Sequence, residues 1–482
     1  MENSVRQQTL SGAKWAAIEK FSVQGIQFGL GIIMARLLMP SDYGIIGMLA
    51  IFIAVSQTFI DSGFCNALIR KIDRTEEDFC TVFYFNIVIA LTCYLVLFVA
   101  APWIANFFHT PILSTILRVQ AITLILNSLM GVHYAKLTIN INFKALAQRT
   151  MLASLVSGVV GVVLAYVGWG VWALVTQNLL STVINLVFIW IYCKWIPRKA
   201  FSKESFHELF SYGSKLLASG LLNTVYVNLT PLIIGRFFSS KDLGEYTRGA
   251  NLAQFPADNI NGVLQKVTFP ILAKLQNDDE HLISVYQKYI CITSMLIFFG
   301  CLLLAAIGKP FVHFLLTEKW DSCIIYLQIY CFSVMFQHIS TINLNLLQVK
   351  GRSDLFLKLE IIKKIISTLI LLASIPFGII GICVSKIIYT QVAVFINCYY
   401  TGKLFHLGYW LQVKEFLPYF GIAIVACIPA YLFTLIDIHP VISIAFGCIV
   451  SPLLYWWFLR KNYAMKEVVD IVKSKIPYLH KY

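Results

Sequence analysis

The stretch Ala35-Arg36-Leu37-Leu38-Met39-Pro40-Ser41-Asp42-Tyr43-Gly44 decides the fold, because it returns two hundred residues later as Gly235-Arg236-Phe237-Phe238-Ser239-Ser240-Lys241-Asp242-Leu243-Gly244. Arginine, aspartate and glycine hold the same places in both copies, and each copy ends a long apolar segment. The segments also begin alike, at Gly12-Ala13-Lys14 and Gly213-Ser214-Lys215. A membrane-length element is therefore predicted to be duplicated. Internal duplication is typical of transporters that place a substrate path between two similar halves.

Composition places the chain in a lipid bilayer. Of its 482 residues 58% are hydrophobic and 13% are charged, and the mean hydropathy is +0.75, whereas soluble proteins are about 45–50% apolar. There is room for about fourteen apolar segments of roughly 20 residues, the length that crosses ~30 Å of hydrocarbon. No stretch between them is long enough for a soluble catalytic domain, and no Walker A loop is present. We therefore predict an all-α polytopic membrane protein that is not an enzyme.

The repeat divides the predicted spans into two six-helix halves. Six spans separate the copies, so the halves share one orientation and are related by an axis along the membrane normal. The predicted parts are an N-terminal half at 1–200, a C-terminal half at 201–402, two additional transmembrane helices at 403–460 and a basic cytoplasmic tail at 461–482. The tail is either an interfacial helix or a solvated extension.

Basic residues orient the spans. With the N-terminus in the cytoplasm, the inside segments hold 25 of the 38 Lys and Arg residues, the outer segments and outer span ends hold 7, and 6 fall within spans. This asymmetry follows the positive-inside rule and predicts a plasma (inner) membrane protein with both termini in the cytoplasm. It also accounts for most of the net charge of +14, so no nucleic-acid partner is predicted.

The predicted eighth span, at 243–273, carries a polar stripe. Its members follow spacings of three and four residues and share one helical face: Arg248, Asn251, Gln254, Asp258, Asn261 and Gln265. Such a stripe cannot face lipid, where each unsatisfied polar group costs several kcal/mol. It either bonds to neighbouring helices or lines a water-filled cavity.

Charged residues in three other spans are candidates for the same cavity. Lys20 and Lys215 lie near the cytoplasmic ends of the first and seventh spans, where each either faces the cavity or reaches the headgroup region. Asp61 in the second span and Asp258 in the eighth are candidate ion-coupling groups. A carboxylate at membrane depth must be neutral, paired or in contact with water.

The repeated arginines and aspartates have two interpretations. Arg36 and Asp42 lie at the outer end of the first copy, and Arg236 and Asp242 lie at the outer end of the second. A structural cap with an ion pair is the favoured role. Contact with a substrate at the outer exit is the alternative.

No metal or cofactor site is predicted. The twelve cysteines lie mostly inside apolar segments and form no C-x-x-C pair, which favours packing roles. The sequence also contains no recognisable set of nucleophile, base and orienting residue. In the eleventh span, Glu360 and Lys364 have the spacing of a local i,i+4 ion pair.

Short motifs over nearly the whole chain resemble those of one family. They are Ser11-Gly12-Ala13-Lys14-Trp15, the turn from Ala35 to Gly44, Phe59-x-Asp61-x-Gly63-Phe64, Ala101-Pro102 with Phe107-Phe108, and Leu243-Gly244-x-Tyr246 followed by Phe269-Pro270. In their order and spacing the chain resembles the polysaccharide transporters. These include the Wzx-type flippases of the multidrug, oligosaccharidyl-lipid and polysaccharide exporter superfamily.

The resemblance implies movement of polyprenyl-pyrophosphate-linked oligosaccharide units from the cytoplasmic to the outer leaflet, for assembly of lipopolysaccharide O-antigen, capsule or exopolysaccharide. It also implies alternating access through a cationic cavity, no ATP hydrolysis by the protein, and a polysaccharide polymerase and assembly proteins as partners. With such a substrate, we expect Lys20, Lys215 and Arg248 to bind the pyrophosphate. The four amides of the stripe would then bind sugar hydroxyls.

Three other functions stay open at this stage. A multidrug antiporter of the same superfamily would have twelve spans and an acidic site, so the basic candidates and the extra span pair argue against it. A lipid II flippase also has fourteen spans, but the turn at 35–44 fits it less well. A membrane glycan polymerase or ligase would carry a large outer loop, whereas the predicted outer loops are short.

Overall fold

The computed structural model describes residues 2–61, 63–436 and 438–460, without the side chains of residues 2–14, 16, 17 and 263–267. Every regular element in these residues is a helix, and eleven segments are long and apolar enough to cross a membrane. The longest of them, Ser353–Phe405, is 53 residues long and contains two helices that each exceed 20 residues. The helices α1 (Glu2–Leu37) and α11 (Ser240–Lys274) are not among the eleven. The predicted all-α membrane fold is confirmed. The count of about fourteen spans stays a prediction, and the predicted tail lies outside the described residues.

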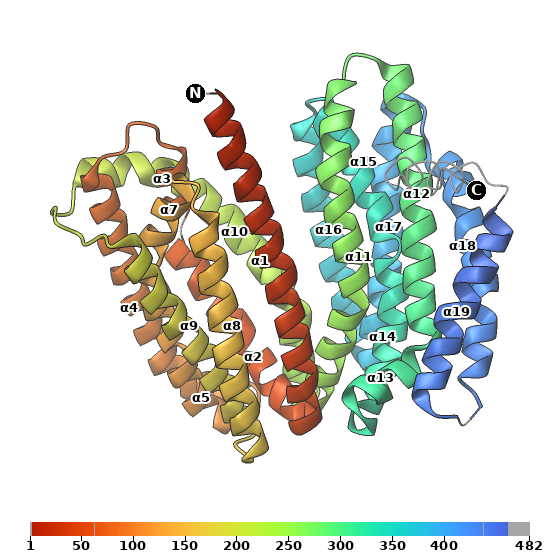
Figure 1. The fold of residues 1–482 in the computed structure, drawn as a ribbon, viewed down its shortest axis with the longest axis horizontal. Coiled ribbons are helices and arrows are strands. Elements are labelled where there is room, and N and C mark those ends of the chain that lie inside the picture. Colours follow the sequence, from red (N-terminus) through yellow and green to blue (C-terminus); the bar gives the residue numbers. More distant parts are fainter. Residues whose placement is uncertain (1, 62, 437, 461–482) are drawn as a thin grey trace. The chain divides into compact units, whose positions relative to one another are not determined.

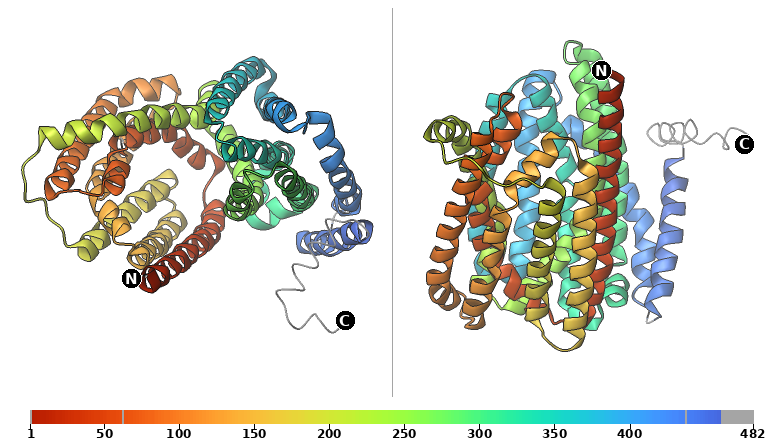
Figure 2. Two further views of the ribbon diagram at one scale, coloured as in Figure 1. Left: turned by 90° about the horizontal axis from the view of Figure 1, so that it is seen from above. Right: turned by 60° about the vertical axis from the view of Figure 1, so that its left-hand side comes forward.

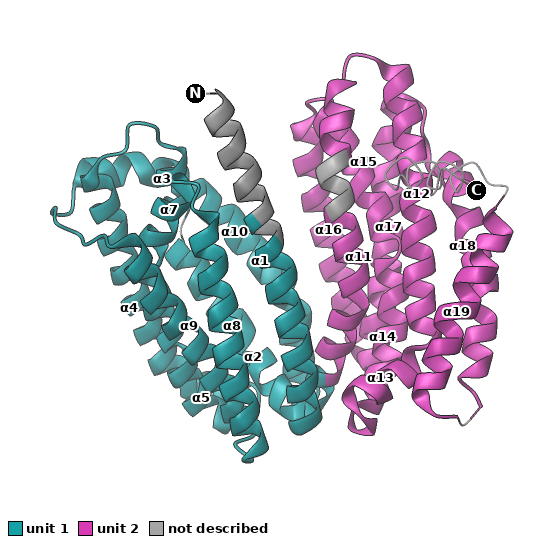
Figure 3. Cartoon of the chain, in the orientation of Figure 1, with its two compact units in different colours: residues 1–244 teal, residues 245–482 magenta. Residues whose placement is uncertain are grey.

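The chain forms two compact units, residues 1–244 and 245–482 (Figure 3). Unit 1 contains the first ten helices and the first turn of the eleventh (Figure 1). These helices are α1 (Glu2–Leu37), α2 (Pro40–Asp61), α3 (Phe64–Arg70), α4 (Glu76–Phe107), α5 (Ile112–Gln120), α6 (Ile122–Ser128), α7 (Gly131–Ile139), α8 (Phe143–Tyr166), α9 (Val171–Cys193), α10 (Lys203–Phe237) and α11 (Ser240–Lys274).

Unit 2 contains the rest of α11 and all later elements (Figure 1). Its two C-terminal helices both fall within the predicted stretch 403–460. The elements are α12 (Asp279–Ala306), α13 (Gly308–Leu316), η1 (Glu318–Trp320), α14 (Asp321–Val334), α15 (Gln337–Val349), α16 (Ser353–Ser374), η2 (Ile375–Phe377), α17 (Gly378–Phe405), α18 (Tyr409–Phe433) and α19 (Pro440–Leu459).

The boundary between the compact units differs from the predicted boundary at 200/201. The units divide after Gly244 because α10 packs against α2, α3 and α4. The predicted halves were defined by the repeat in the sequence, whereas the compact units are defined by the packing of the helices. The two six-helix halves therefore stay a prediction.

Helices that are far apart in the sequence lie side by side in unit 1. α8 lies between α1 and α9 (Figures 1 and 2). Their contact is made by Met34 of α1, Leu38 directly after it, Ala165 of α8, and Ala173 and Leu174 of α9, all of which are buried. Small side chains such as alanine let membrane helices approach closely and gain dispersion contacts.

Both copies of the repeated sequence form the same capped turn. Asp42 Oδ2 accepts the backbone N–H of Met39 at 2.9 Å. Asp242 Oδ2 accepts the backbone N–H of Ser239 at 3.0 Å. Each carboxylate therefore satisfies a backbone donor at the start of the following helix, α2 or α11, where negative charge also suits the helix dipole.

The arginine of the second copy has other partners than predicted. Arg236 bonds to the ring of His109, and its Cζ lies 4.9 Å from the centre of the Phe107 ring. The Asp242 carboxylate instead accepts a hydrogen bond from the hydroxyl of Ser239 at 2.6 Å. Among the described residues the predicted ion pair between Arg236 and Asp242 is therefore not formed. The pairing of Arg36 with Asp42 stays a prediction.

The two turns pack directly against each other. A methyl group added at Gly44 would lie 1.7 Å from the carbonyl oxygen of Ser240, and one added at Gly244 would lie 1.9 Å from the carbonyl oxygen of Pro40. The glycine of each copy therefore admits the backbone of the other copy, in a reciprocal contact. Only glycine allows two backbones to approach so closely, which gives a physical reason for the repeated glycine.

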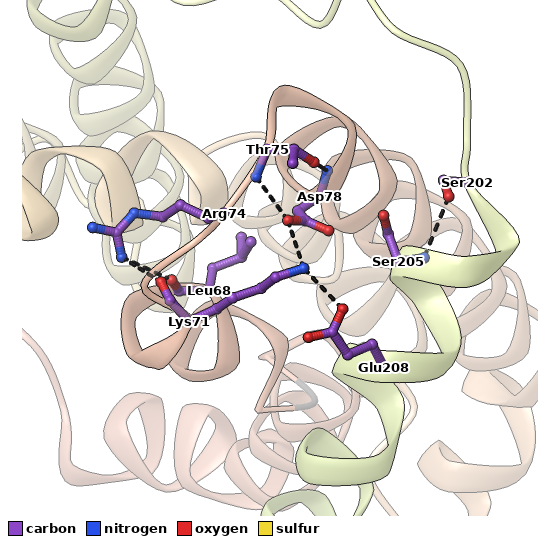
Figure 4. A network of polar contacts seen from close by, with 8 residues as sticks. All are labelled: Leu68, Lys71, Arg74, Thr75, Asp78, Ser202, Ser205 and Glu208. Carbon is purple, nitrogen blue, oxygen red and sulfur yellow. Dashed lines mark hydrogen bonds and ion pairs between the residues drawn. The ribbon is translucent and has the colours of Figure 1, made fainter.

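A charged network fixes the first turns of α10 to the loop between α3 and α4 (Figure 4). Lys71 Nζ lies 3.0 Å from Asp78 Oδ2 and 2.8 Å from Glu208 Oε2. Asp78 is buried and forms a capping box with Thr75 at the start of α4. Partial burial lowers the pKa of Lys71, but the hydrogen bonds and charges of Glu208 and Asp78 outweigh it and raise that pKa above its usual value.

Unit 2 has a buried polar network that joins four helices. Asn343 Oδ1 of α15 accepts hydrogen bonds from the hydroxyls of Tyr286 of α12 at 2.9 Å and Thr401 of α17 at 2.7 Å. Gln412 of α18 accepts from Asn343 Nδ2 at 2.9 Å and donates to the carbonyl of Leu407 at 2.8 Å. Hydrogen bonds in such a low-dielectric interior are strong, and a satisfied network favours one helix arrangement.

Candidate functional site

A cleft of about 350 Å³ lies along α1 in unit 1. Lys20, Gln24 and Gln27 line it from one face of α1, because they are four and three residues apart. Glu19 also lines it, and Thr150 of α8 donates a hydrogen bond to Glu19 Oε1 at 2.8 Å. The cleft therefore presents an ammonium group, a carboxylate and two amides.

The charges in this cleft favour an anionic ligand. Glu19 is held by Thr150 and attracts the guanidinium of Arg149, the preceding residue of α8. Lys20 is exposed, and its ammonium forms no ion pair with any residue that the structure describes. Its positive charge is therefore available to a phosphate or carboxylate, which forms stronger hydrogen bonds with an ionised donor than with a neutral one.

Asp61 stands at the end of a hydrogen-bonded chain between α6 and α2. Asn127 Nδ2 donates to Gln57 Oε1 at 2.9 Å, and Gln57 Nε2 donates to Asp61 Oδ1 at 2.9 Å. The Asp61 side chain is exposed. The chain fixes the direction of the carboxylate, while its role as an ion-coupling group stays a prediction.

Lys215 lies where α10 packs against the turn between α2 and α3. A methyl group at Gly63 would lie 2.9 Å from the carbonyl oxygen of Gly213, so this turn abuts the part of α10 that carries Lys215. Farther along the same contact, the hydroxyl oxygens of Thr58 and Thr224 are 3.0 Å apart. Lys215 is exposed and does not line the Lys20 cleft.

The residues of α11 that are packed most tightly lie on a different face of the helix from most of the polar stripe. Ala250, Ala253 and Ala257 are buried, and Gly249 packs so tightly that an added methyl group would lie 2.9 Å from the carbonyl oxygen of Cys323 on α14. Arg248 of the stripe lies close enough to Cys323 for their side chains to interact electrostatically, and its Nε is buried. Asn251 and Asp258 are exposed, whereas Arg248, Gln254 and Asn261 are partly buried. The side chain of Gln265 lies outside the described residues.

The predicted site residues belong to both units. Lys20, Asp61 and Lys215 are in unit 1, and the residues of the α11 stripe are in unit 2. That both groups line one cavity stays a prediction.

Two polar residues of interest were not apparent from the sequence. Thr150 reaches Glu19 only because α8 packs against α1. Lys386 lies inside the apolar helix α17 and is partly buried. Hydropathy averaged over a whole span conceals a single lysine. The position of Lys386 in the interior of an apolar segment could nevertheless have marked it as a candidate polar site.

The fold has solved relatives among multi-span membrane proteins. It matches a solved structure of the lipid II flippase MurJ in an inward closed conformation with a TM-score of 0.73. The match covers 93% of this chain and 99% of that chain at 14% sequence identity. At this identity the likeness shows the fold alone.

The chain belongs to the polysaccharide biosynthesis protein family, whose model matches residues 33–325. It is 25% identical over 364 residues to the teichuronic acid biosynthesis protein TuaB of Bacillus subtilis (strain 168), which covers 73% of each chain. It is 24% identical over 366 residues to the lipopolysaccharide biosynthesis protein WzxC of Escherichia coli (strain K12), covering 75% of this chain and 74% of that one. The resemblance noted in the sequence is thereby confirmed.

Proposed function

We propose that this protein moves polyprenyl-pyrophosphate-linked oligosaccharides from the cytoplasmic to the outer leaflet of the plasma membrane by alternating access. The observation that carries the proposal is the cleft on α1, with an exposed ammonium at Lys20 and the amides of Gln24 and Gln27. Membership of the polysaccharide biosynthesis family supports a glycan substrate. The multi-span fold supports transport rather than enzymatic synthesis.

The proposed substrate explains why cationic and amide groups occur together. A pyrophosphate with a polar glycan cannot cross hydrocarbon unaided, whereas its polyprenyl tail can stay in lipid. Lys20, Lys215 and Arg248 supply positive charge to the pyrophosphate, and ionised donors make the stronger hydrogen bonds to phosphate. The amides of the α11 stripe, Asn251, Gln254, Asn261 and Gln265, replace water around the sugar hydroxyls.

Both termini lie in the cytoplasm in this proposal. The basic residues concentrate in the segments that would then face inside, as the positive-inside rule requires. The substrate is accordingly taken up from the leaflet where the glycan is built. A polysaccharide polymerase and other assembly proteins use it on the outer side.

The membrane potential can drive this movement. Outward transfer of an anion is favoured by an inside-negative potential by about 2.3 kcal/mol per charge per 100 mV. Basic residues that move with the substrate reduce this gain, because they carry opposite charge. Asp61 or Asp258 would instead couple the transfer to a proton or sodium ion.

The basic residues are tested by export in cells. Cells carry Lys20→Ala, Lys215→Ala or Arg248→Ala in place of the native protein, and the lipid-linked glycan that reaches the outer leaflet is measured against protein abundance in the membrane. We expect each change to lower export, because each removes one cation from the anionic headgroup. Full export by all three variants would overturn the assignment of these residues.

A purified-protein assay separates the substrate classes. Proteoliposomes are supplied with polyprenyl-pyrophosphate oligosaccharide, lipid II or a cationic drug in turn. Transfer of the oligosaccharide lipid in preference to the other two supports the proposal. Preference for lipid II or for the drug would replace it with one of the other functions of this superfamily.

A further inference from the structure

Helix α17 has one face turned outward and one turned into unit 2. Ile380, Val384 and Ile388, at successive intervals of four residues, are exposed. Ile379 and Ala393 lie seven residues before and after Lys386, and both are buried. Seven residues make nearly two helical turns, so these three residues share one face. Lys386 therefore projects from the buried face of α17, roughly opposite the exposed apolar one.

Lys386 is also deep along the helix axis. It lies eight residues after Gly378, where α17 begins, which is about 12 Å at 1.5 Å per residue. The other end of the helix, at Phe405, is farther still. The four-carbon stem of a lysine reaches only about 6 Å. Lys386 consequently cannot place its ammonium at the end of its own helix.

The nearby hydroxyls bond to the backbone of Lys386 rather than to its ammonium. Ser333 of α14 and Thr390 of α17 donate to the Lys386 carbonyl oxygen, at 3.2 Å and 2.8 Å. Their own hydroxyl oxygens are 3.1 Å apart. These bonds hold α14 against α17 at this level. The ammonium of Lys386 makes no hydrogen bond or ion pair within the described part of the chain.

A lysine in the neighbouring helix α16 is buried in the usual way, as part of an ion pair. Lys363 of α16 is buried and pairs with Glu360, three residues before it. The pairing of Glu360 with Lys364 that its spacing indicates stays a prediction. Ammonium groups at membrane depth are costly and usually paired. No carboxylate among the described residues pairs with Lys386, which leaves its ammonium able to bind an anionic ligand.

We propose that Lys386 is an anion contact in unit 2 that binds the diphosphate of the lipid-linked substrate during its passage. The proposal rests on the function proposed above and adds a binding residue outside the cleft on α1 and the stripe on α11. An ammonium is a compact charge with three donors, which suits phosphate oxygens that change position as the substrate moves. A diphosphate offers more charge to this group than a monophosphate does.

Transport kinetics in proteoliposomes test the proposal. Lys386→Met keeps the length of the side chain and removes its charge, Lys386→Arg keeps the charge, and Lys403→Met removes an exposed lysine at the end of the same helix. For Lys386→Met we expect the apparent KM for polyprenyl-diphosphate oligosaccharide to rise about tenfold to a hundredfold, as for loss of a hydrogen bond to a charged group. Lys386→Arg recovers most of the affinity, and Lys403→Met behaves as the wild type.

The same assay separates binding from structural damage. With a monophosphate-linked sugar of the same length, Lys386→Met should lose less affinity than with the diphosphate. An equal loss for both substrates, without recovery in Lys386→Arg, would show a structural role and overturn the proposal. So would a wild-type KM in Lys386→Met. If an anionic phospholipid is the true partner, Lys386→Met will match the wild type in vesicles of phosphatidylcholine alone, which also overturns it.

Direct binding keeps the inference independent of transport. The purified wild type and Lys386→Met are heated with increasing inorganic diphosphate, and the unfolding temperature is recorded. Stabilisation of the wild type that Lys386→Met lacks supports the anion contact even if no flipping is observed, in which case the proposed function alone fails. Equal responses of the two proteins overturn the contact at Lys386.

Discussion

The contact between the two copies of the repeat makes a strong prediction for Gly44→Ala. The new methyl carbon would lie 1.7 Å from the carbonyl oxygen of Ser240, whereas such atoms ordinarily stay more than about 3 Å apart. The starts of α2 and α11 must then separate by roughly 1.5 Å, because neither partner is a flexible side chain that can turn away. Overpacking typically costs about 1–3 kcal/mol, and a backbone obstacle places this change at the upper end.

The magnitude can be converted to a measurable shift. A loss of about 3 kcal/mol lowers the Tm of a unit of this size by roughly 6–12 °C, at 2–4 °C per kcal/mol. The assay is thermal unfolding of the purified protein in detergent. Gly25→Ala in α1 is the matched control, since an added methyl group there meets nothing within 4 Å. It should leave the Tm unchanged or slightly raised, because alanine favours the helix over glycine.

The double variant sharpens this test. Gly244→Ala places a methyl group 1.9 Å from the carbonyl oxygen of Pro40, in the same reciprocal contact. Once the first change has separated the two backbones, the second should cost less than it does alone, so the two losses add to less than their sum. Equal Tm values for Gly44→Ala and Gly25→Ala, or full additivity of the two glycine changes, would refute the reasoning.

Three further predictions concern stability and pH. Lys71→Met leaves the buried carboxylate of Asp78 without its cation and should cost about 2 kcal/mol in thermal unfolding, whereas Lys199→Met removes an exposed pair and should cost less than about 1 kcal/mol. The folded-state pKa of Lys71 is raised, so its contribution to the free energy of unfolding is complete below its ordinary pKa and is lost as pH rises through the higher folded value. Unfolding measured through the alkaline range should show this loss in the wild type and not in Lys71→Met. Gln412→Ala removes the buried partner of Asn343 and Tyr286 and should cost about 1–3 kcal/mol; a wild-type Tm would contradict the role given to this network.

The sequence predicted the parts of the fold that depend on composition and periodicity. Apolar length and basic asymmetry were sufficient for a multi-span membrane protein. The match between residues 35–44 and 235–244 located two turns with the same carboxylate cap, at Asp42 and Asp242. The sequence could not predict that these turns pack against each other, because a close approach of two backbones leaves no mark except the glycines.

The polar contacts that the sequence did not predict have a common physical cause. The partner of a charged side chain is set by packing as well as by spacing in the sequence. Arg236 was expected to pair with Asp242, but His109 from the α4–α5 connection reaches it instead. Glu360 has lysines at both i+3 and i+4, and the structure shows the buried one, Lys363, as a partner that the i,i+4 spacing did not indicate. Thr150 lines the α1 cleft because α8 packs against α1, and no local sequence pattern indicates this contact.

The proposed transport function is tested most directly by transfer of a fluorescent polyprenyl-pyrophosphate oligosaccharide across the membrane of proteoliposomes, with the wild type and Lys20→Ala compared at equal protein. The wild type should bring the glycan within reach of an impermeant reagent on the opposite side. Lys20→Ala should be slower by about tenfold or more, as expected when a charged hydrogen bond to phosphate is lost. Transfer at the rate of empty vesicles in the wild type, or at the wild-type rate in Lys20→Ala, would contradict the central claim.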